Sequence, residues 1–317
     1  MIKDNRKEDK QTISPPGIWR RFSYYYYRNF LQKEILLSAP IMCDKDSDIE
    51  VHILTCRRDF LSALWALKTF YYYAGVRCRL FVHGDGSLDN RTPDILRRHF
   101  INAVFISKAK ADEALKSHLN GCQWSSFFRL KDAYHPLSMK LFDFFYYSRT
   151  QRIIMLDSDT LFFKRPAECL KHISAQRGFF LNDSVDSYSL PLWCLNELFG
   201  IEILERVNTG FIFFAEGVHH DLSLIERCLS HMADAGFFKK SLIEQTVLAV
   251  ILSHHKGAFM RLPDTYQVSE TQPTEEAACG HPAGGGDRIN FYIEGLRRLK
   301  NSKFLESLNN GRIHNII

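Results

Sequence analysis

The stretch "RIIMLDSDTLFFKRP", residues 152–166, decides the fold of this chain. Its first apolar residues have the length of a strand and predict one that is buried on both faces. Asp157 follows this run directly, and Asp159 projects to the same side of an extended chain. Because ligands of open parallel sheets collect at the carboxyl ends of the strands, the stretch predicts two carboxylates that face one point at the edge of a sheet.

Two carboxylates this close repel each other, and a bound divalent cation that prefers oxygen ligands explains their placement. We therefore expect Asp157 and Asp159 to bind Mn²⁺ or Mg²⁺. The alternative is a pair of solvated aspartates in a turn. Because the flanking residues "IIML" and "LFF" are apolar, full solvation is unfavourable and the cation site is the preferred interpretation.

Strand-like and helix-like segments alternate on both sides of this motif, and the first helix is expected to end at Gly75. The alternation predicts an α/β fold with a Rossmann-like, mostly parallel sheet flanked by helices. The expected strands are residues 49–55, 78–83, 103–107, 152–157, 178–182 and 209–214. The expected helices are residues 59–75, 92–100, 137–147, 221–234, 242–253 and 289–309, and residues 267–288 are expected to form a long loop.

The 317 residues are enough for one large domain, and no repeat or long linker divides them. We expect a single domain over residues 46–317 and an N-terminal extension over 1–45, partly disordered or helical. Residues 1–16 are polar and charged and are predicted to be disordered. Residues 19–36 mix arginines with aromatic residues, which is consistent either with a helix packed on the domain or with a segment lying on a membrane or a partner.

Charge and cysteine content narrow the class of protein. The formal charge of +5 is modest and spread along the chain, which argues against nucleic-acid binding and suits a small polyanion such as a nucleotide diphosphate. The eight cysteines form no C-x-x-C pair and are expected to be reduced and mostly buried. The charged start "MIKDNRKEDK" is not the pattern expected of a secretory signal, and no apolar run reaches the roughly 18 residues that span a bilayer. We expect a cytoplasmic protein, with peripheral membrane contact through the N-terminal segment as an open alternative.

The segment "LSMKLFDFFYYSRTQRIIMLDSDTLFFKRP", residues 137–166, is similar to the central segment of glycosyltransferase family 8, the nucleotide-sugar transferases of the glycogenin and lipopolysaccharide galactosyltransferase type. In that family a helix with a lysine or arginine precedes a strand that ends in an Asp-x-Asp motif. Further matches follow in family order: "NDS" (182–184), "VNTGFIFF" (207–214), "EQTVLAVIL" (244–252) and His281 beside glycines. Glu244 stands where the family has aspartate, and "PAGGG" after His281 has more glycines than the family pattern.

This resemblance implies an A-type glycosyltransferase fold and a metal-dependent, retaining transfer of a hexose from a nucleotide-diphospho-sugar, with a UDP sugar as the expected donor. It implies that Asp157, Asp159 and His281 are the metal ligands. A cation on both phosphates stabilises the charge of the departing nucleotide diphosphate. The acceptor is a saccharide, a lipid-linked glycan or a protein. Aromatic residues in 112–135 and 184–200 form either a sugar platform or packing contacts.

The resemblance also assigns residues to the donor. Lys140, on the helix before the metal strand, is expected against the diphosphate or the sugar, unless it is an ordinary surface lysine. Arg288 suits bidentate contact with the diphosphate. The residues implied to line the donor sugar and anomeric carbon are Asp183, Asn208 and Gln245, and the implied catalytic group is Asp183, Glu244 and Gln245. The other substrate-binding candidates are Asn208, Thr209 and Ser158, with Thr55, the loop "CRRD" (56–59) that contains Arg57, and Asp85 expected at the nucleoside. For Asn208 the alternative is a turn-forming role before Gly210.

Two other functions stay open. "IIMLDSDT" also resembles the D-x-D-x-T signature of haloacid-dehalogenase-type phosphatases, in which Asp157 would be the nucleophile and Asp159 the acid/base, with Mg²⁺ as cofactor. That signature usually opens its domain, whereas a strand-and-helix pattern already precedes it here. The second alternative is a non-catalytic nucleotide-sugar-binding protein that keeps the metal site.

Overall fold

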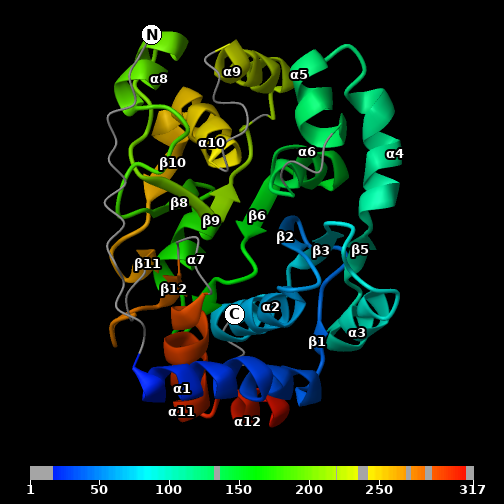
Figure 1. Ribbon diagram of the computed structural model, residues 1–317, viewed down its shortest axis with the longest axis vertical. Helices are drawn as coiled ribbons and strands as arrows, with labels where there is room; N and C mark the ends of the chain where they lie inside the picture. The colour runs from blue at the N-terminus through cyan, green and yellow to red at the C-terminus, as the bar shows by residue number, and fades with distance from the viewer. Residues whose placement is uncertain are drawn as a thin grey trace.

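The computed structural model describes residues 17–131, 136–218, 220–234, 242–268, 273–282 and 288–311. The strands of the central sheet are β2 (Ile49–Thr55), β3 (Arg79–Gly84), β5 (Val104–Ile106), β6 (Arg152–Leu156), β8 (Gly178–Asn182), β9 (Val207–Phe214) and β10 (Phe259–Arg261). Their order is β10-β8-β9-β6-β2-β3-β5 (Figure 1). β9 runs antiparallel to β6 and β8, whereas the other neighbouring pairs are parallel. The predicted α/β class with a mostly parallel sheet is therefore confirmed.

Helices cover both faces of this sheet (Figure 1). The α-helices are α1 (Ile18–Asn29), α2 (Phe60–Ala74), α3 (Thr92–His99), α4 (Lys108–His118), α5 (Gln123–Ser126), α6 (Ser138–Tyr147), α7 (Ala167–Ser174), α8 (Leu192–Phe199), α9 (Leu222–Asp234), α10 (Ile243–His254), α11 (Arg297–Asn301) and α12 (Phe304–Asn309). The 3₁₀ and π segments are η1 (Leu31–Leu37), η2 (Phe127–Lys131), η3 (Lys256–Ala258) and η4 (Phe291–Leu296). The predicted helices are confirmed except that the one expected over 289–309 is divided into η4, α11 and α12. Helix α2 ends at Gly75, whose φ of 68° lies in the left-handed region.

Two small sheets complete the fold. β1 (Ile41–Met42) pairs with β4 (Phe100–Ile101), and β12 (Cys279–His281) lies between β11 (Tyr266–Val268) and β7 (Leu161–Phe162). The prediction of one loop over 267–288 is wrong for β12, because its backbone pairs with both neighbours and its side chains are buried. The remainder of that predicted loop falls partly on 269–272 and 283–287, which lie outside the described residues.

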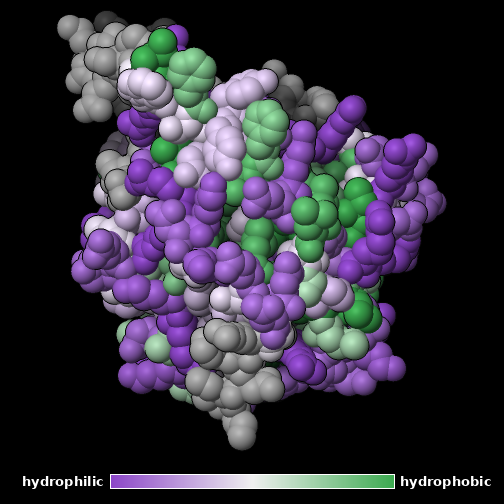
Figure 2. All heavy atoms as spheres, turned by 90° about the horizontal axis from the view of Figure 1, so that it is seen from below, coloured by the Kyte–Doolittle hydropathy of each residue, from purple (hydrophilic) through white to green (hydrophobic). Residues whose placement is uncertain are grey.

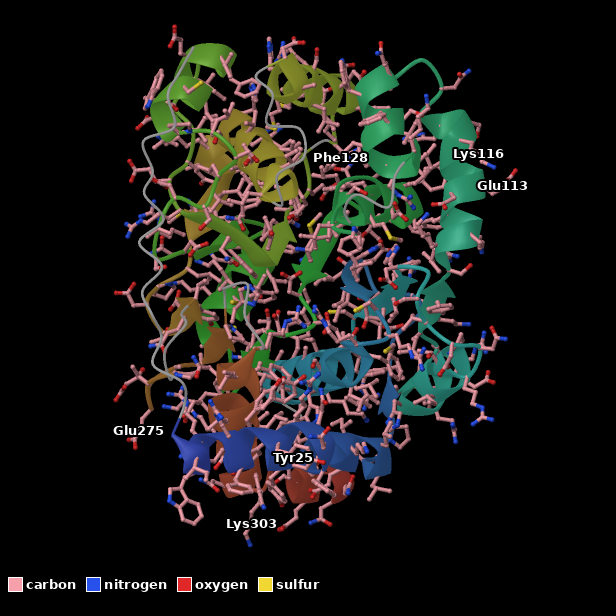
Figure 3. The ribbon with its side chains drawn as sticks, viewed as in Figure 1. Tyr25, Glu113, Lys116, Phe128, Glu275 and Lys303 are labelled. Carbon is pink, nitrogen blue, oxygen red and sulfur yellow. The ribbon has the colours of Figure 1, made fainter. Side chains whose placement is uncertain are left out.

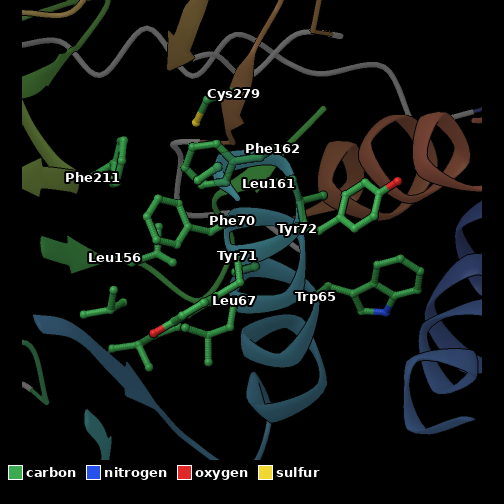
Figure 4. Close-up of a cluster of buried hydrophobic side chains, with 14 of the residues drawn as sticks. Trp65, Leu67, Phe70, Tyr71, Tyr72, Leu156, Leu161, Phe162, Phe211 and Cys279 are labelled. Atoms are coloured by element: carbon green, nitrogen blue, oxygen red, sulfur yellow. The ribbon is translucent and has the colours of Figure 1, made fainter. Parts of the chain in front are cut away.

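Alternate residues of the central strand enter two hydrophobic cores. Ile154 and Leu156 pack with α2 in the first core, whereas Ile153 and Met155 pack with α6 and α10 in the second. In the first core the rings of Phe70, Phe162 and Phe211 meet at centroid distances of 5.2 to 5.8 Å (Figure 4). Because β6 is apolar on both faces, its end is a rigid position for the acidic residues that follow.

The N-terminal segment packs on the rest of the chain. η1 contributes Leu31 and Ile35 to the first core, and α1 lies beside η4 and α11 at one end of the molecule (Figure 1). The predicted disorder of residues 1–16 concerns a segment outside the described residues, and the domain boundary near residue 45 stays a prediction. Within the described part of the chain, no helix combines the length and hydropathy needed to cross a membrane. All eight cysteines are free and five of them are buried, as expected.

Candidate active site

The acidic motif lies where the central strand ends. β6 pairs with β2 in register, so that Leu156 faces Ile53 and the two strands end at the same edge. The backbone N–H of Asp157 donates to the Gly210 carbonyl at 2.8 Å, which ties the motif to β9. Asp159 is 5% exposed, so the alternative of two solvated turn aspartates is wrong for this residue.

Asp157, Asp159 and His281 come together as predicted. Each offers one ligand atom, and these three atoms lie within 4.8 Å of one another. Nδ1 of His281 is 3.2 Å from Oδ1 of Asp159, and Nε2 is 3.9 Å from Oδ2 of Asp157. Thr160 Oγ lies 3.2 Å from the same Nδ1 and orients the ring. Two carboxylates and one imidazole are a donor set that suits Mn²⁺ and, through its oxygens, Mg²⁺, so these residues fit the expected cation.

Gly210 permits this arrangement. A Cβ atom at this position would lie 2.7 Å from Cδ2 and Nε2 of His281 and 3.0 Å from Oδ1 of Asn208. Any side chain larger than hydrogen would therefore displace the imidazole or the amide. The glycine of the predicted strand "VNTGFIFF" is explained by this close approach and not by its backbone conformation.

Arg288 pairs with the acidic motif and with the start of α2. Its Nε is 2.9 Å from Oδ2 of Asp159, and one terminal nitrogen is 2.8 Å from Oδ1 of Asp59. The φ of Arg288 is 51°, in the left-handed region that most residues avoid. Asp59 belongs to the loop "CRRD" expected at the nucleoside but was not singled out as a site residue. Its signal in the sequence is an acidic residue directly before the apolar helix α2, where N-cap residues are common.

The electrostatics of the motif follow from these contacts. Burial alone would raise the pKa of Asp159, but the positive charges of His281 and Arg288 outweigh it and lower the pKa to about 2. Burial would likewise lower the pKa of His281, yet the carboxylates of Asp159 and Asp157 raise it above its usual value. Without a cation, the two basic side chains therefore balance the acidic pair.

Lys140 lies beneath the acidic motif. Its side chain is 1% exposed, so the alternative of a surface lysine is wrong. Nζ is 2.7 Å from Oδ1 of Asp157 and 3.4 Å from Oε1 of Glu244, and it donates to Oγ1 of Thr209 at 3.3 Å. Burial raises the pKa of Glu244 to about 7, although Lys140 opposes this shift. The three predicted residues Lys140, Thr209 and Glu244 thus form one buried polar group. Within it, the ion pair from Lys140 holds the Asp157 carboxylate in position.

Amide and carboxylate side chains from β9, from α10 and from the residue after β8 also lie near the motif. Asn208 Nδ2 donates to Oδ2 of Asp183 at 3.1 Å, and its Oδ1 accepts from the Gly210 N–H at 2.9 Å. The side-chain amide of Gln245 donates to the Ser187 carbonyl at 2.8 Å. Asn208 lies within strand β9, so the turn-forming alternative is wrong, although its side chain does bond the Gly210 N–H; its role at the donor stays a prediction.

A cavity of about 530 Å³ joins these groups. This volume is within the range of small-molecule and cofactor sites, roughly 300–1,000 Å³. Its lining includes the predicted residues Thr55, Asp85, Asp157, Ser158, Asp159, Asp183, Asn208, Gln245, His281 and Arg288. Cys56, Arg58 and Asp59, from the loop "CRRD" expected at the nucleoside, also line it, as do Leu137 and Ser187, which were not predicted. The hydroxyl of Thr55 is buried and has no hydrogen-bond partner within the described residues. Because buried polar groups are normally bonded, this hydroxyl is available to a ligand in the cavity.

Several predicted residues lie away from the cavity. Arg57 is exposed and is not part of the lining, whereas its neighbours in "CRRD" are. The aromatic residues considered as a sugar platform differ in position. Tyr188 is buried and donates its hydroxyl to the Leu204 carbonyl at 2.6 Å, so it packs, whereas Trp193 on α8 is 60% exposed. The segment 184–200 is not simply a loop, because it contains α8.

No protein-family model matches the chain, and no curated protein sequence does. Solved structures do. Mouse xyloside xylosyltransferase 1 in its apo form matches with a TM-score of 0.51 and 12% identity over 76% of this chain and 98% of that chain. The galactosyltransferase LgtC matches with a TM-score of 0.51 and 12% identity over 85% of this chain and 98% of its own. The bifunctional glycosyltransferase WbbM matches with a TM-score of 0.52 and 11% identity over 86% of this chain, which covers 53% of WbbM.

At these identities the likeness shows the fold alone. The chain has the A-type glycosyltransferase fold, as the resemblance implied. The similarity noted in the sequence is therefore confirmed for the fold.

Proposed function

We propose that this chain is a divalent-metal-dependent glycosyltransferase that moves a hexose from a UDP sugar to a saccharide, lipid-linked glycan or protein, with retention of configuration. The observation that carries the proposal is the group of Asp157, Asp159 and His281 in a cavity at the end of the sheet. LgtC, which shares the fold, was solved with donor and acceptor sugar analogues, and this supports the proposal. The phosphatase alternative loses support, because β6 follows β2, β3 and β5 in the chain instead of opening the domain.

The strand order suggests how a nucleotide sugar lies in the cavity. Thr55 ends β2 and Asp85 follows β3 on one side of β6, whereas Asp183 and Asn208 lie at the same edge of β8 and β9 on the other. The acidic motif is between them. A donor with its diphosphate over β6 therefore has its nucleoside at Thr55 and Asp85 and its hexose at Asp183 and Asn208.

The residues of the chain have separate tasks in this proposal. A cation held by Asp157, Asp159 and His281 supplies positive charge for the departing diphosphate. Arg288 adds a second positive group once a phosphate competes with its carboxylate partners. The oxygens of Asp183, Asn208 and Gln245 stabilise the positive charge that develops on the anomeric carbon. Lys140 holds the Asp157 carboxylate in position, and Glu244 balances the charge of Lys140.

The test is donor turnover. The full chain is incubated with Mn²⁺ and a panel of UDP hexoses, and UDP release is measured with and without EDTA, while NMR reports the anomeric configuration of the product. Metal-dependent release of UDP from one donor supports a transferase, and an α product from an α donor supports retention. Stabilisation by UDP and Mn²⁺ without any donor turnover would instead favour the non-catalytic binding protein. Hydrolysis of a phosphate monoester with Mg²⁺ would favour the phosphatase.

A further inference from the structure

Helix α1 presents a row of large apolar side chains to solvent. Trp19 is 81% exposed, Phe22 is 63% exposed and Tyr25 is 61% exposed. They stand three residues apart, which puts them on one face of the helix. The rings of Trp19 and Phe22 are 6.4 Å apart, and Phe30 continues the row with its ring 6.2 Å from that of Tyr25. Single exposed aromatic residues are ordinary, but a continuous row marks a contact surface.

The row is not needed to hold α1 in place. The opposite face of the helix carries Tyr24 and Tyr27, which pack against the first core. The ring of Tyr24 meets that of Tyr292 edge-on at 5.5 Å. α1 therefore buries one face and exposes another that is equally aromatic. This second face has no packing role within the described residues.

Basic side chains surround the row. α1 has three arginines and no acidic residue. Arg21 and Lys33 have no acidic partner within the described part of the chain, and Lys300 lies close by, donating to the hydroxyl of Tyr26 at 3.0 Å. Of the acidic residues near α1, Glu294 and Glu306 pair with Arg297 and Lys303. The end of the molecule that carries α1 is therefore basic as well as apolar.

The position of α1 at the end of the molecule favours a planar partner over other kinds of partner. α1 lies across one end of the molecule, and Tyr25 and Lys303 project from that same end (Figures 1 and 3). Viewed onto this end, hydrophobic side chains lie among hydrophilic ones (Figure 2). A planar partner can contact the whole row at once. Trp and Tyr favour the boundary between hydrocarbon and water, and arginine reaches lipid phosphates beside them.

We propose that the α1 face, defined here as Trp19, Phe22, Tyr25 and Arg21 of α1 together with Lys33 of η1, docks this protein on the surface of an anionic phospholipid bilayer. The aromatic side chains enter the headgroup region, and the two basic side chains contact lipid phosphate. This is the behaviour of an interfacial amphipathic helix, which lies in the plane of the membrane without crossing it. The proposal is independent of the reaction proposed above, because none of these residues lines the cavity.

The experiment is cosedimentation of the full chain with vesicles of phosphatidylcholine alone or with phosphatidylglycerol. The wild type is expected to bind the anionic vesicles more tightly, and high salt is expected to weaken this binding. Trp19→Ser with Phe22→Ser is expected to reduce binding on the order of tenfold or more, because two large apolar side chains no longer enter the lipid. Arg21→Gln with Lys33→Gln is expected to cost about 5-fold per charge at low salt. Trp193→Ser, at the α8 end, is the matched control and is expected to bind as the wild type does.

Two measurements protect this test against misfolding. Circular dichroism and the melting temperature compare the variants with the wild type, and quenching by brominated lipid is measured on the wild type and on Trp19→Phe. Quenching that is lost in Trp19→Phe supports the proposal. Equal binding to neutral and anionic vesicles, or quenching unaffected by Trp19→Phe, overturns it. If the wild type self-associates in light scattering, does not bind vesicles, and becomes monomeric in the Trp19 and Phe22 variant, the α1 face is a contact between copies instead, and the proposal is again overturned.

Discussion

Replacing Gly210 by alanine tests whether the close contact with His281 builds the metal site. The new Cβ would lie 2.7 Å from two atoms of the imidazole. Comfortable contacts between carbon atoms are about 3.5–4.0 Å, so the ring has to move by roughly 1 Å. Metal–ligand distances tolerate only about 0.2 Å of error, and the displaced nitrogen therefore leaves the bonding distance. We expect Mn²⁺ affinity to fall about 10–100-fold, as when the supporting contacts of a metal ligand are lost.

The assay is calorimetric titration of Mn²⁺ in the presence of UDP, with urea unfolding of the metal-free protein as a second measurement. Overpacking is expected to cost about 1–3 kcal/mol of unfolding free energy. Gly257→Ala is the matched control, because a Cβ there meets nothing within 4 Å, and its Mn²⁺ affinity is expected to be unchanged. In a His281→Ala background, Gly210→Ala should cause no further loss of affinity, since its effect acts through the imidazole.

Two results would refute this reasoning. The first is wild-type Mn²⁺ affinity in Gly210→Ala, which would mean that His281 either accommodates the methyl group or is not a ligand. The second is an equal loss of affinity with and without His281, which would assign the effect of the methyl group to the strand or to Asn208.

Three further predictions concern the charges of the site. Asp159→Asn should abolish Mn²⁺-dependent UDP binding while the protein stays folded, which UDP titration and circular dichroism check; unchanged metal-dependent turnover would contradict the assignment. Lys140→Met should destabilise the protein by about 3–5 kcal/mol in urea unfolding, because it leaves buried carboxylates without a partner, and adding Glu244→Gln should recover part of this loss. The pKa of His281 is raised, so below it Mn²⁺ must displace a proton. Mn²⁺ affinity should therefore fall as the pH is lowered, with one proton released per ion, and a His281→Gln variant that keeps the same pH slope would argue against this origin.

The sheet was predictable because its main strands are recognisable from their own apolar sequences. β6 and residues 211–214 of β9 are apolar on both faces, and Asp157 and Asp159 follow β6 closely, so position and chemistry were readable together. β12 was missed, since its three residues are a strand only through pairing with β7 and β11. Short elements held by distant partners leave little trace in local periodicity.

The neighbours of the acidic motif were harder to read than the motif itself. Lys140 stands in a helix that could equally face solvent, and its burial depends on Asp157 and Glu244, which are distant in the chain. The pairing of Arg288 with Asp59 joins a late segment to the start of α2 in the same way. Such ion pairs are a property of the assembled sheet, because residue type predicts a charge but not its partner.

The most direct test of the metal site is an anomalous difference map from a crystal of this protein soaked with Mn²⁺ and UDP. We predict one strong peak within roughly 2.5 Å of oxygen atoms of Asp157 and Asp159 and a nitrogen of His281, with the diphosphate on the same ion. A map in which UDP occupies the cavity while no manganese lies at these three side chains would contradict the account.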